Sequence, residues 1–320
     1  MRQSISKPRT YAPSLFMRPT RPTMRAVPGR DIYGRPPPRE TAGVGDQAIS
    51  RRSLFRLRLS GAARRDIDLD GVLDRVRACW DREGHEPLLR QLEPAAELLA
   101  DLALVAPGKR VLDAAAGDGN VALAAAQRGA EVDACDLSPR MVERGRARCA
   151  AAFWRVADVQ ELPYDDGEFD AVLSSFGAHL APKPSQAAGE LVRVTRPGGF
   201  VALAAWIPRG LPGRLDELVE RFTPLPDGVP QPDRWGVEEV VRRRLEPLLE
   251  DLQLRTRTLP LRFDSPEAAF ETLMLAHPLD AQDREALRPR FERLLSSCNG
   301  AAPAVAIDAR YLAAVGRRKL

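Results

Sequence analysis

Acidic side chains and glycines meet in one short segment in the first half of the chain. Residues 111–120 read Val-Leu-Asp-Ala-Ala-Ala-Gly-Asp-Gly-Asn, so Asp113 ends an apolar run and Asp118 follows it closely. Small residues stand at alternate positions after Asp113, namely Ala115, Gly117 and Gly119. Small side chains let a ligand approach the backbone at a strand-to-helix turn. Tight packing alone also explains such a turn, so both interpretations stay open at this point.

The turn also satisfies the spacing of the dinucleotide fingerprint, with Gly117, Gly119 and Ala122. A pyrophosphate is anionic and is bound by amide N–H groups at a helix N-terminus. Asp113 and Asp118 would each repel it, by about 4 kcal/mol for unit charges ~4 Å apart at an effective dielectric constant near 20. The same carboxylates favour a ligand with cationic centres. S-adenosylmethionine, which carries a sulfonium, an ammonium and an adenosine, fits this requirement better than NAD.

Two further aspartates follow the next two predicted strands. Asp136 ends the apolar stretch that begins at residue 131, where a carboxylate can accept both ribose hydroxyls. Asp158 follows the third strand and is placed to accept from the exocyclic amine of adenine. Each aspartate alone is equally well explained as a solvated loop residue or a helix cap. Three acids at successive strand ends favour a ligand site, because ligands bind at that edge of a parallel sheet.

The elements that must position these residues alternate along the chain. Five apolar stretches predict strands, at residues 110–113, 131–135, 153–156, 169–174 and 199–206. Helical patterns lie between most of them, at residues 120–128, 139–152 and 186–194. Apolar residues at helical spacing over residues 73–102 predict helices before the first strand. Strands that alternate with helices indicate crossover connections and a doubly wound parallel α/β sheet.

Residues 75–206 resemble the class I S-adenosylmethionine-dependent methyltransferases, closest to the type of ubiquinone and menaquinone biosynthesis. Six segments carry the resemblance in order, at residues 111–120, 135–141, 158–164, 166–172, 174–177 and 193–199. The resemblance implies a Rossmann-like sheet of seven strands whose last strand is antiparallel, completed by residues 252–263 and 307–315. It places residues 66–320 in one methyltransferase domain, in which residues 207–320 complete the sheet and cover the substrate pocket.

The resemblance also implies the cofactor, S-adenosylmethionine, and assigns residues to its parts. The aminocarboxypropyl and ribose side would be held by the first turn, at Asp113, Ala115, Gly117, Asp118 and Gly119. The remaining contacts would come from the next strand ends: Asp136 to the ribose, Asp158 and Val159 to the adenine, and Ser175 near the methionine end. Ala115 departs from the commonest glycine at its position, although relatives with alanine there are familiar.

Methyl transfer is an in-line displacement, and near-attack geometry in a dry pocket supplies most of its acceleration. Many acceptors therefore need no base. His179, which follows the fourth strand, is the candidate base for a hydroxyl or an activated carbon, and the alternative is a rim histidine that packs or binds substrate. His85 is expected at a helix start. Four aromatic residues are candidates to line an acceptor pocket, or else core residues: Trp80, Trp206, Phe222 and Trp235.

Charge divides the chain into a basic tail and an acidic body. Residues 1–65 hold 15 basic and three acidic residues, a net charge of +12, which leaves −8 for the rest of a chain whose total is +4. Prolines and arginines without apolar periodicity predict that this tail is disordered, which leaves open whether it is a contact arm. Its Arg51-Arg52 pair resembles a twin-arginine export motif but lacks the apolar run that such a signal needs.

Composition restricts the class of protein further. No apolar run approaches the ~20 residues of a membrane span, and four cysteines without close spacing indicate neither a disulfide scaffold nor a metal site. We therefore expect a cytoplasmic methyltransferase of a small-molecule acceptor. The alternatives are an NAD-dependent oxidoreductase, a catalytically silent methyltransferase-like binding protein, and an RNA methyltransferase, which the acidic body disfavours. The acceptor, the atom methylated and the oligomeric state stay open.

Overall fold

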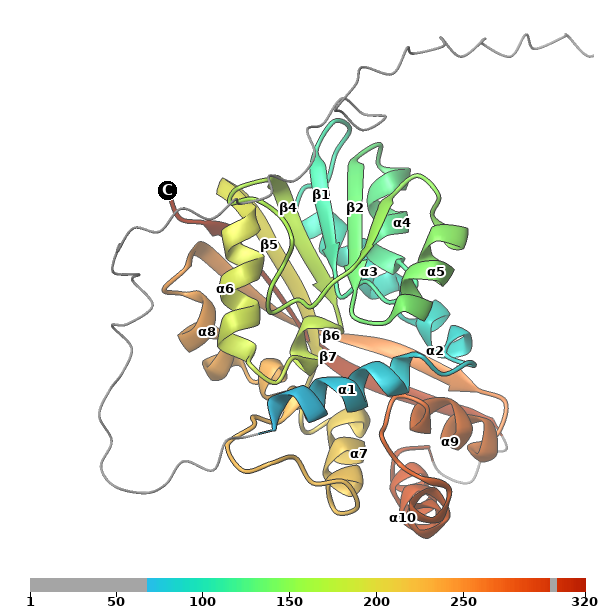
Figure 1. Ribbon diagram of the computed structural model, residues 1–320. Helices are drawn as coiled ribbons and strands as arrows, with labels where there is room; N and C mark the ends of the chain where they lie inside the picture. Colours follow the sequence, from blue (N-terminus) through green and yellow to red (C-terminus); the bar gives the residue numbers. More distant parts are fainter. Residues whose placement is uncertain (1–67, 300–303) are drawn as a thin grey trace, which may run out of the picture. The chain divides into compact units, whose positions relative to one another are not determined.

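A seven-stranded sheet forms the centre of the computed structural model, which describes residues 68–299 and 304–320 (Figure 1). Its strands are β1 (Arg110–Ala114), β2 (Glu131–Asp136), β3 (Phe153–Val156), β4 (Phe169–Ser175), β5 (Thr195–Trp206), β6 (Leu249–Phe263) and β7 (Val305–Arg318). They lie in the order β3-β2-β1-β4-β5-β7-β6. The first five strands are parallel, and β7 runs antiparallel between β5 and β6. The doubly wound sheet and its antiparallel last strand are confirmed.

Strand order reverses next to β1, because the chain first moves outward to β2 and β3 and then returns to form β4 and β5 on the other side. In an open α/β sheet, ligands bind outside the carboxyl ends of the strands at such a switch point. The sequence-predicted aspartates follow β1, β2 and β3, so the topology brings them to one edge.

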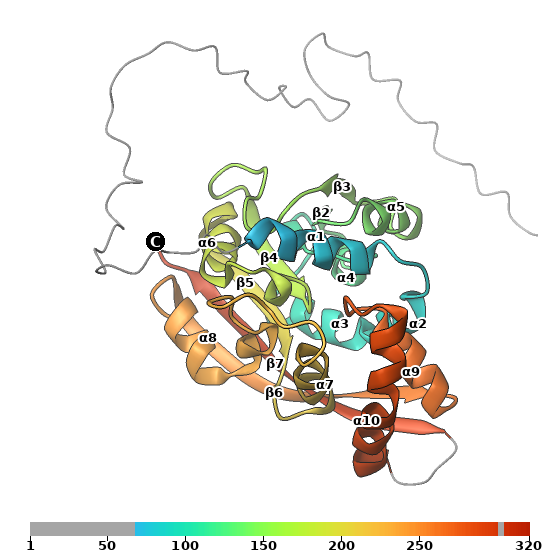
Figure 2. The same ribbon diagram turned by 60° about the horizontal axis from the view of Figure 1, so that its bottom comes forward.

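Helices cover both faces of the sheet, as Figures 1 and 2 show. They are α1 (Leu69–Trp80), α2 (Glu86–Gln91), α3 (Glu93–Leu102), α4 (Asn120–Gln127), α5 (Pro139–Arg148), α6 (Pro184–Val194), α7 (Leu211–Glu220), α8 (Glu238–Leu245), α9 (Pro266–Met274) and α10 (Ala281–Asn299). Two short 3₁₀ turns, η2 (Ala178–Leu180) and η3 (Pro232–Gly236), complete the set of described helical elements that bear on the site.

Alternate residues of each strand enter two separate cores, as the pleat of a strand requires. On β1, Val111 belongs to the core formed with α2–α5, α7, α9 and α10, whereas Leu112 belongs to the core formed with α6, α8 and η3 on the other face. Both side chains are fully buried. Burial on both faces explains why the central parallel strands read as continuous, mainly apolar runs rather than as alternating patterns.

The helix ends differ slightly from those expected. The pattern over residues 73–102 is divided among α1, α2 and α3, because Pro87 and Pro94 each begin a new helix. Helix α5 begins at the cap Ser138, whose hydroxyl accepts from the Met141 N–H, and it ends at Arg148 rather than at residue 152. No helix in residues 68–299 is long and apolar enough to cross a bilayer. The predicted tail, with its twin-arginine-like pair, lies outside the described residues.

Candidate active site

A cavity opens at the carboxyl ends of β1, β2, β3 and β4. Helix α1 runs across this edge of the sheet (Figure 1). It encloses about 840 Å³ of empty space up to its open mouth. Residues from α1 form its cover, among them Leu73, Val76 and Trp80. Seven of the sequence-predicted site residues line it: Asp113, Ala115, Gly117, Asp136, Asp158, Val159 and Ser175. The other three, Asp118, Gly119 and His179, lie elsewhere.

Asp136 ends β2 and holds the neighbouring turn in place. One carboxylate oxygen accepts the Gly117 N–H at 2.7 Å, and the other accepts the Ser138 N–H at 2.9 Å. Each carboxylate oxygen has a second lone pair, so the group can still accept hydrogen bonds from the cavity. Burial raises the pKa of Asp136 to about 6; the Ser138 and Gly117 N–H groups oppose this rise, and the Asp81 carboxylate adds to it. Asp136 is therefore ionised at neutral pH.

Asp113 differs from Asp136 in its charge state. Its side chain is buried, and one oxygen accepts the N–H of Ala122 in the first turn of α4 at 2.8 Å. Burial raises the pKa of Asp113 to about 8, more than the Ala122 hydrogen bond lowers it. The group is thus mainly the neutral acid at pH 7. Its expected role as a fixed negative charge against a pyrophosphate is not supported by this environment.

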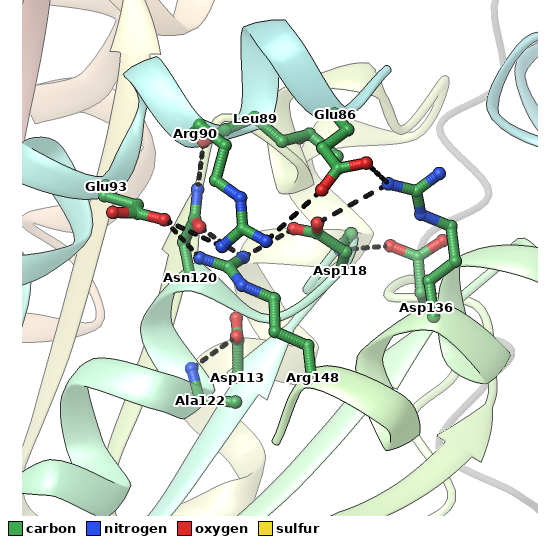
Figure 3. A network of polar contacts seen from close by, with 12 residues as sticks. Glu86, Leu89, Arg90, Glu93, Asp113, Asp118, Asn120, Ala122, Asp136 and Arg148 are labelled. Carbon is green, nitrogen blue, oxygen red and sulfur yellow. Dashed lines mark hydrogen bonds and ion pairs between the residues drawn. The ribbon is translucent and has the colours of Figure 1, made fainter. Parts of the chain in front are cut away.

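Asp118 and Gly119 have structural surroundings that the sequence did not indicate. The Asp118 carboxylate does not line the cavity and accepts a hydrogen bond from Arg148 at 2.8 Å (Figure 3). Gly119 has a φ of +92°, and a Cβ there would lie 2.7 Å from the Trp154 ring. Asp118 is consequently neutralised by a cation, and Gly119 is required by packing and backbone conformation. Neither Asp113, which is mainly neutral, nor Asp118, which pairs with Arg148, therefore presents an uncompensated negative charge that would repel the pyrophosphate of NAD.

The backbone at Ala115 is closely approached by a glycine from another part of the chain, Gly177. Ala115 has a φ of +53°, in the left-handed region that normally favours glycine. Gly177 lies directly against it, since a Cβ on Gly177 would stand 2.3 Å from the Ala115 carbonyl oxygen. Phe176, between the cavity and the core, also has a positive φ, of +58°. Strained residues of this kind persist where the surrounding structure fixes them, and they are frequent at functional sites.

The far side of the cavity combines apolar walls with a few polar groups. Val159 is buried there, and Asp158 accepts from both the backbone N–H and the side-chain amide of Gln160, at 2.9 and 2.8 Å. The Ser175 hydroxyl is buried and has no hydrogen-bond partner among the described residues. Because Ser175 lines the cavity, a bound polar group is the natural partner for this hydroxyl.

A second, larger cavity of about 1290 Å³ adjoins the first. Five residues line both cavities: Val76, Trp80, Leu92, Phe176 and Leu180. Trp206, stacked on Phe176 with ring centroids 4.0 Å apart, also lines the second cavity. Trp235 and Phe222 are absent from both linings, and Trp235 is a fully buried core residue. The two cavities thus meet at a mainly apolar wall.

His179 lies on η2 and lines this second cavity. Its imidazole is buried, and Nδ1 has no hydrogen-bond partner in the part of the chain that the structure describes. Burial lowers the pKa of His179 to about 4, so the ring is neutral at physiological pH. His85, by contrast, begins α2 as expected, where its Nε2 bonds the Cys79 carbonyl at 2.9 Å. His85 lines neither cavity.

Several residues of the site were not predicted from the sequence. Asn120 lines the first cavity and donates to the Leu89 carbonyl at 2.8 Å, which ties the start of α4 to α2. Leu73 and Val76 of α1 and the wall residue Leu180 were likewise missed, whereas Trp80 of α1 and Trp206 were candidates for a pocket lining and do line a cavity. Helical periodicity located α1, but no local pattern shows which part of the sheet a helix covers. No group of three or more metal-ligating side chains occurs among residues 68–299 and 304–320.

Comparison with known proteins places this architecture in a family. Residues 112–203 match the family model described as "Methyltransferase domain". Two uncharacterized Mycobacterium tuberculosis proteins, Rv1403c and Rv1405c, are 40% and 35% identical over 182 and 202 residues. These alignments cover 55% and 61% of this chain and 66% and 74% of the relatives, so the chain spans about two thirds of their length.

A named relative and a solved structure agree with the family model. The demethylmenaquinone methyltransferase of Clavibacter sepedonicus is 37% identical over 146 residues, which are 42% of this chain and 56% of that protein. The crystal structure of the YcgJ protein from Bacillus subtilis shares the fold, with a TM-score of 0.52 at 19% identity, over 71% of this chain and 98% of that one. The chain belongs to the class I S-adenosylmethionine-dependent methyltransferases. S-adenosylmethionine is the cofactor of this family.

The residues of the first cavity fit this cofactor. A carboxylate with unused lone pairs suits ribose hydroxyls, and Asp136 is one. Gly117 has a φ of +56°, which glycine adopts readily, and its lack of a side chain leaves its backbone accessible to a ligand in the cavity. The orphaned Ser175 hydroxyl offers a further contact to a polar ligand.

Proposed function

We propose that this protein transfers a methyl group from S-adenosylmethionine to a small, largely apolar acceptor that occupies the second cavity. The observation that carries the proposal is the wall shared by the two cavities, at Val76, Trp80, Leu92, Phe176 and Leu180. Because the same residues line both cavities, ligands in the two cavities would lie next to each other, as an in-line displacement requires. Bound S-adenosylmethionine would supply the electrophilic methyl group.

Binding of the cofactor is assigned to the residues of the first cavity. Asp136 would accept hydrogen bonds from the ribose hydroxyls, and Ser175 would form a hydrogen bond near the methionine end. Asp158 and Val159 would contact the adenine. Gly117 and Ala115 would bring backbone against the ligand. Asp113 contributes by fixing the start of α4 through its bond to Ala122. Apolar walls around these groups exclude water, which favours displacement of a sulfonium.

His179 is the proposed proton acceptor for an acceptor hydroxyl or activated carbon. A neutral imidazole with an unpartnered, buried Nδ1 can accept a hydrogen bond from a hydroxyl in the second cavity. The low pKa makes it a weak base in the resting protein. It would therefore hold the hydroxyl in position and accept its proton as the oxygen loses electron density to the new bond. A protonated carboxylic acid could not accept this proton, whereas a neutral histidine has a free lone pair that can.

Replacing His179 with alanine is expected to lower kcat/KM by about 10²–10⁴-fold if the ring removes a proton. Affinity for S-adenosylhomocysteine should stay unchanged, because His179 does not line the cofactor cavity. The assay measures release of S-adenosylhomocysteine from S-adenosylmethionine in the presence of candidate acceptors. The panel consists of phenols, quinols (demethylmenaquinol among them) and hydroxylated isoprenoids, and mass spectrometry identifies the products. Full turnover by the alanine variant would exclude His179 as a base and leave it a packing residue.

The same assay tests the function itself. A methylated product from one member of the panel supports the methyltransferase proposal, and the product identifies the atom. Tight cofactor binding without product from any acceptor would favour the catalytically silent binding protein instead. We further propose that the protein works in the cytoplasm, where the buried thiols of Cys79, Cys135 and Cys149 remain reduced.

The ionisation of Asp136 predicts a pH dependence of cofactor binding. Ribose hydroxyls need the carboxylate as acceptor, and protonation removes part of its accepting capacity. Affinity for S-adenosylhomocysteine should therefore be constant near pH 7 and should decrease as the pH falls through the pKa of about 6. Calorimetric titrations from about pH 5 to pH 7 measure this, in a range where Asp113, with a pKa of about 8, stays mainly protonated. The Asp136→Asn variant should bind more weakly without the decrease; an unaltered decrease in it would assign the effect to another group.

A further inference from the structure

Behind the cofactor turn lies a group of polar side chains that no part of the proposed chemistry uses. We call it the Arg148 cluster: Arg148 with its direct partners Glu93, Asp118 and Asn120 (Figure 3). Its members come from separate parts of the chain. Glu93 begins α3, Asp118 lies in the turn after β1, Asn120 begins α4, and Arg148 ends α5.

One guanidinium joins all of these elements. Nη1 of Arg148 donates to the Asp118 carboxylate at 2.8 Å and to the Asn120 side-chain oxygen at 2.6 Å. Nη2 donates to Glu93. The planar fork of arginine suits such a junction, because it presents several N–H groups in fixed directions. The Asp118 and Arg148 side chains are only 4% and 9% exposed, so water screens their attraction little.

Of the cluster, only Asn120 lines the cofactor cavity. Neither Arg148 nor Asp118 lines the cavity, whereas Gly117 and Asn120, on either side of Asp118 in the sequence, both do. Asn120 also links the cluster to α2, because its side-chain amide donates to the carbonyl of Leu89, another residue that lines the cavity. Two neighbouring arginines enlarge the network: Arg90 pairs with Glu93 at 3.2 Å, and Arg144 pairs with Glu86 at 3.6 Å.

We propose that Arg148 is a positioning residue for the cofactor: it fixes the turn at residues 117–120 against α2 and α3, and cofactor affinity depends on it without direct contact. The inference rests on the proposed cofactor site. Loss of the guanidinium would leave the buried Asp118 carboxylate without its principal cation, and the turn would move to hydrate it. Movement of the turn would displace the Gly117 N–H from Asp136 and alter the ribose site.

The test compares Arg148→Met with a matched variant, Arg128→Met, in the full-length protein. Arg128 also joins α3 to α4, through ion pairs with Glu97 at 2.7 Å and Asp101 at 2.6 Å. It lies at the opposite end of α4 and lines neither cavity. Both variants should unfold at lower urea concentration. Only Arg148→Met should lose affinity for S-adenosylhomocysteine in calorimetric titration, by about 10- to 100-fold.

Unchanged affinity in Arg148→Met, or an equal loss in both variants, would overturn the positioning role and leave a purely structural ion pair. If Arg148→Met does not fold, Arg148→Lys decides, since lysine keeps the charge without the fork. A several-fold weaker affinity in a folded Arg148→Lys protein supports the inference, and wild-type affinity refutes it. Failure of the wild-type protein to bind S-adenosylhomocysteine would instead refute the cofactor site, and with it this inference.

Discussion

Replacing Asp136 with alanine is expected to weaken S-adenosylhomocysteine binding by at least about 100-fold, which is ~2.7 kcal/mol. Two causes add. The ribose hydroxyls lose hydrogen bonds to a charged acceptor, each worth about 1.5–3 kcal/mol. The Gly117 and Ser138 N–H groups also lose the acceptors that they have at 2.7 and 2.9 Å, so the turn is no longer fixed. Isothermal titration calorimetry of the full-length protein measures the change.

Two further variants make the Asp136 result specific. Asp136→Asn keeps one acceptor oxygen, so its affinity should lie between those of the wild type and the alanine variant. Asp166→Ala is the control, because this aspartate is 74% exposed and pairs only at the surface with Arg193. Its affinity should equal that of the wild type. Binding by Asp136→Ala within about threefold of the wild type would show that Asp136 does not hold the ribose.

Replacing Gly177 with alanine should damage both the fold and the cofactor site. The added Cβ would lie 2.3 Å from the Ala115 carbonyl oxygen and 2.6 Å from the Ala115 Cβ, far inside van der Waals contact. Ala115 is already in the left-handed region and has little freedom to move. We expect a loss of about 1–3 kcal/mol in the free energy of unfolding, the usual range for overpacking. Cofactor affinity should decrease as well, because the displaced Ala115 lines the cavity.

Urea unfolding and calorimetry of Gly177→Ala test this expectation against Gly189→Ala. Gly189 lies inside α6, and a Cβ there would meet nothing within 4 Å. Alanine at that position should stabilise the helix by about 0.5–1 kcal/mol and leave binding unchanged. Adding Ala115→Gly to Gly177→Ala should recover part of the loss, since it removes the contact between the two β-carbons and relieves the strained φ. A Gly177→Ala protein as stable as the wild type would contradict the tight approach of these two segments.

Much of the fold could be predicted because its signals are local. The central parallel strands are short, mainly apolar runs buried on both faces, and Val111 and Leu112 show how one such run serves two cores. Strand β3, at the edge of the sheet, is partly exposed. The last two strands, of which β7 is the antiparallel one, were placed in the sheet by resemblance to the family. Asp136 and Asp158 were found because a strand end and a sheet edge are defined by sequence order alone once the sheet is parallel.

The remaining features depend on contacts between distant residues. Asp118 was expected at the cofactor because it lies in the glycine turn, yet Arg148, 30 positions later, pairs with it. Arg148 could not be distinguished in sequence from Arg144 and Arg146, which lie on the same helix. The charge state of Asp113 follows from burial, which the sequence does not report. His179 was placed on the correct edge, but only the fold shows that it faces the second cavity.

The most direct test of the central claim is calorimetric titration of the full-length protein with S-adenosylhomocysteine and, separately, with NAD. The cofactor of the family and the cavity that Asp136, Asp158 and Ser175 line predict micromolar binding of one S-adenosylhomocysteine per chain and no heat with NAD. Binding of NAD without binding of S-adenosylhomocysteine would contradict the assignment of this cavity. It would favour the interpretation of the turn at Gly117 and Gly119 as a dinucleotide-binding fingerprint.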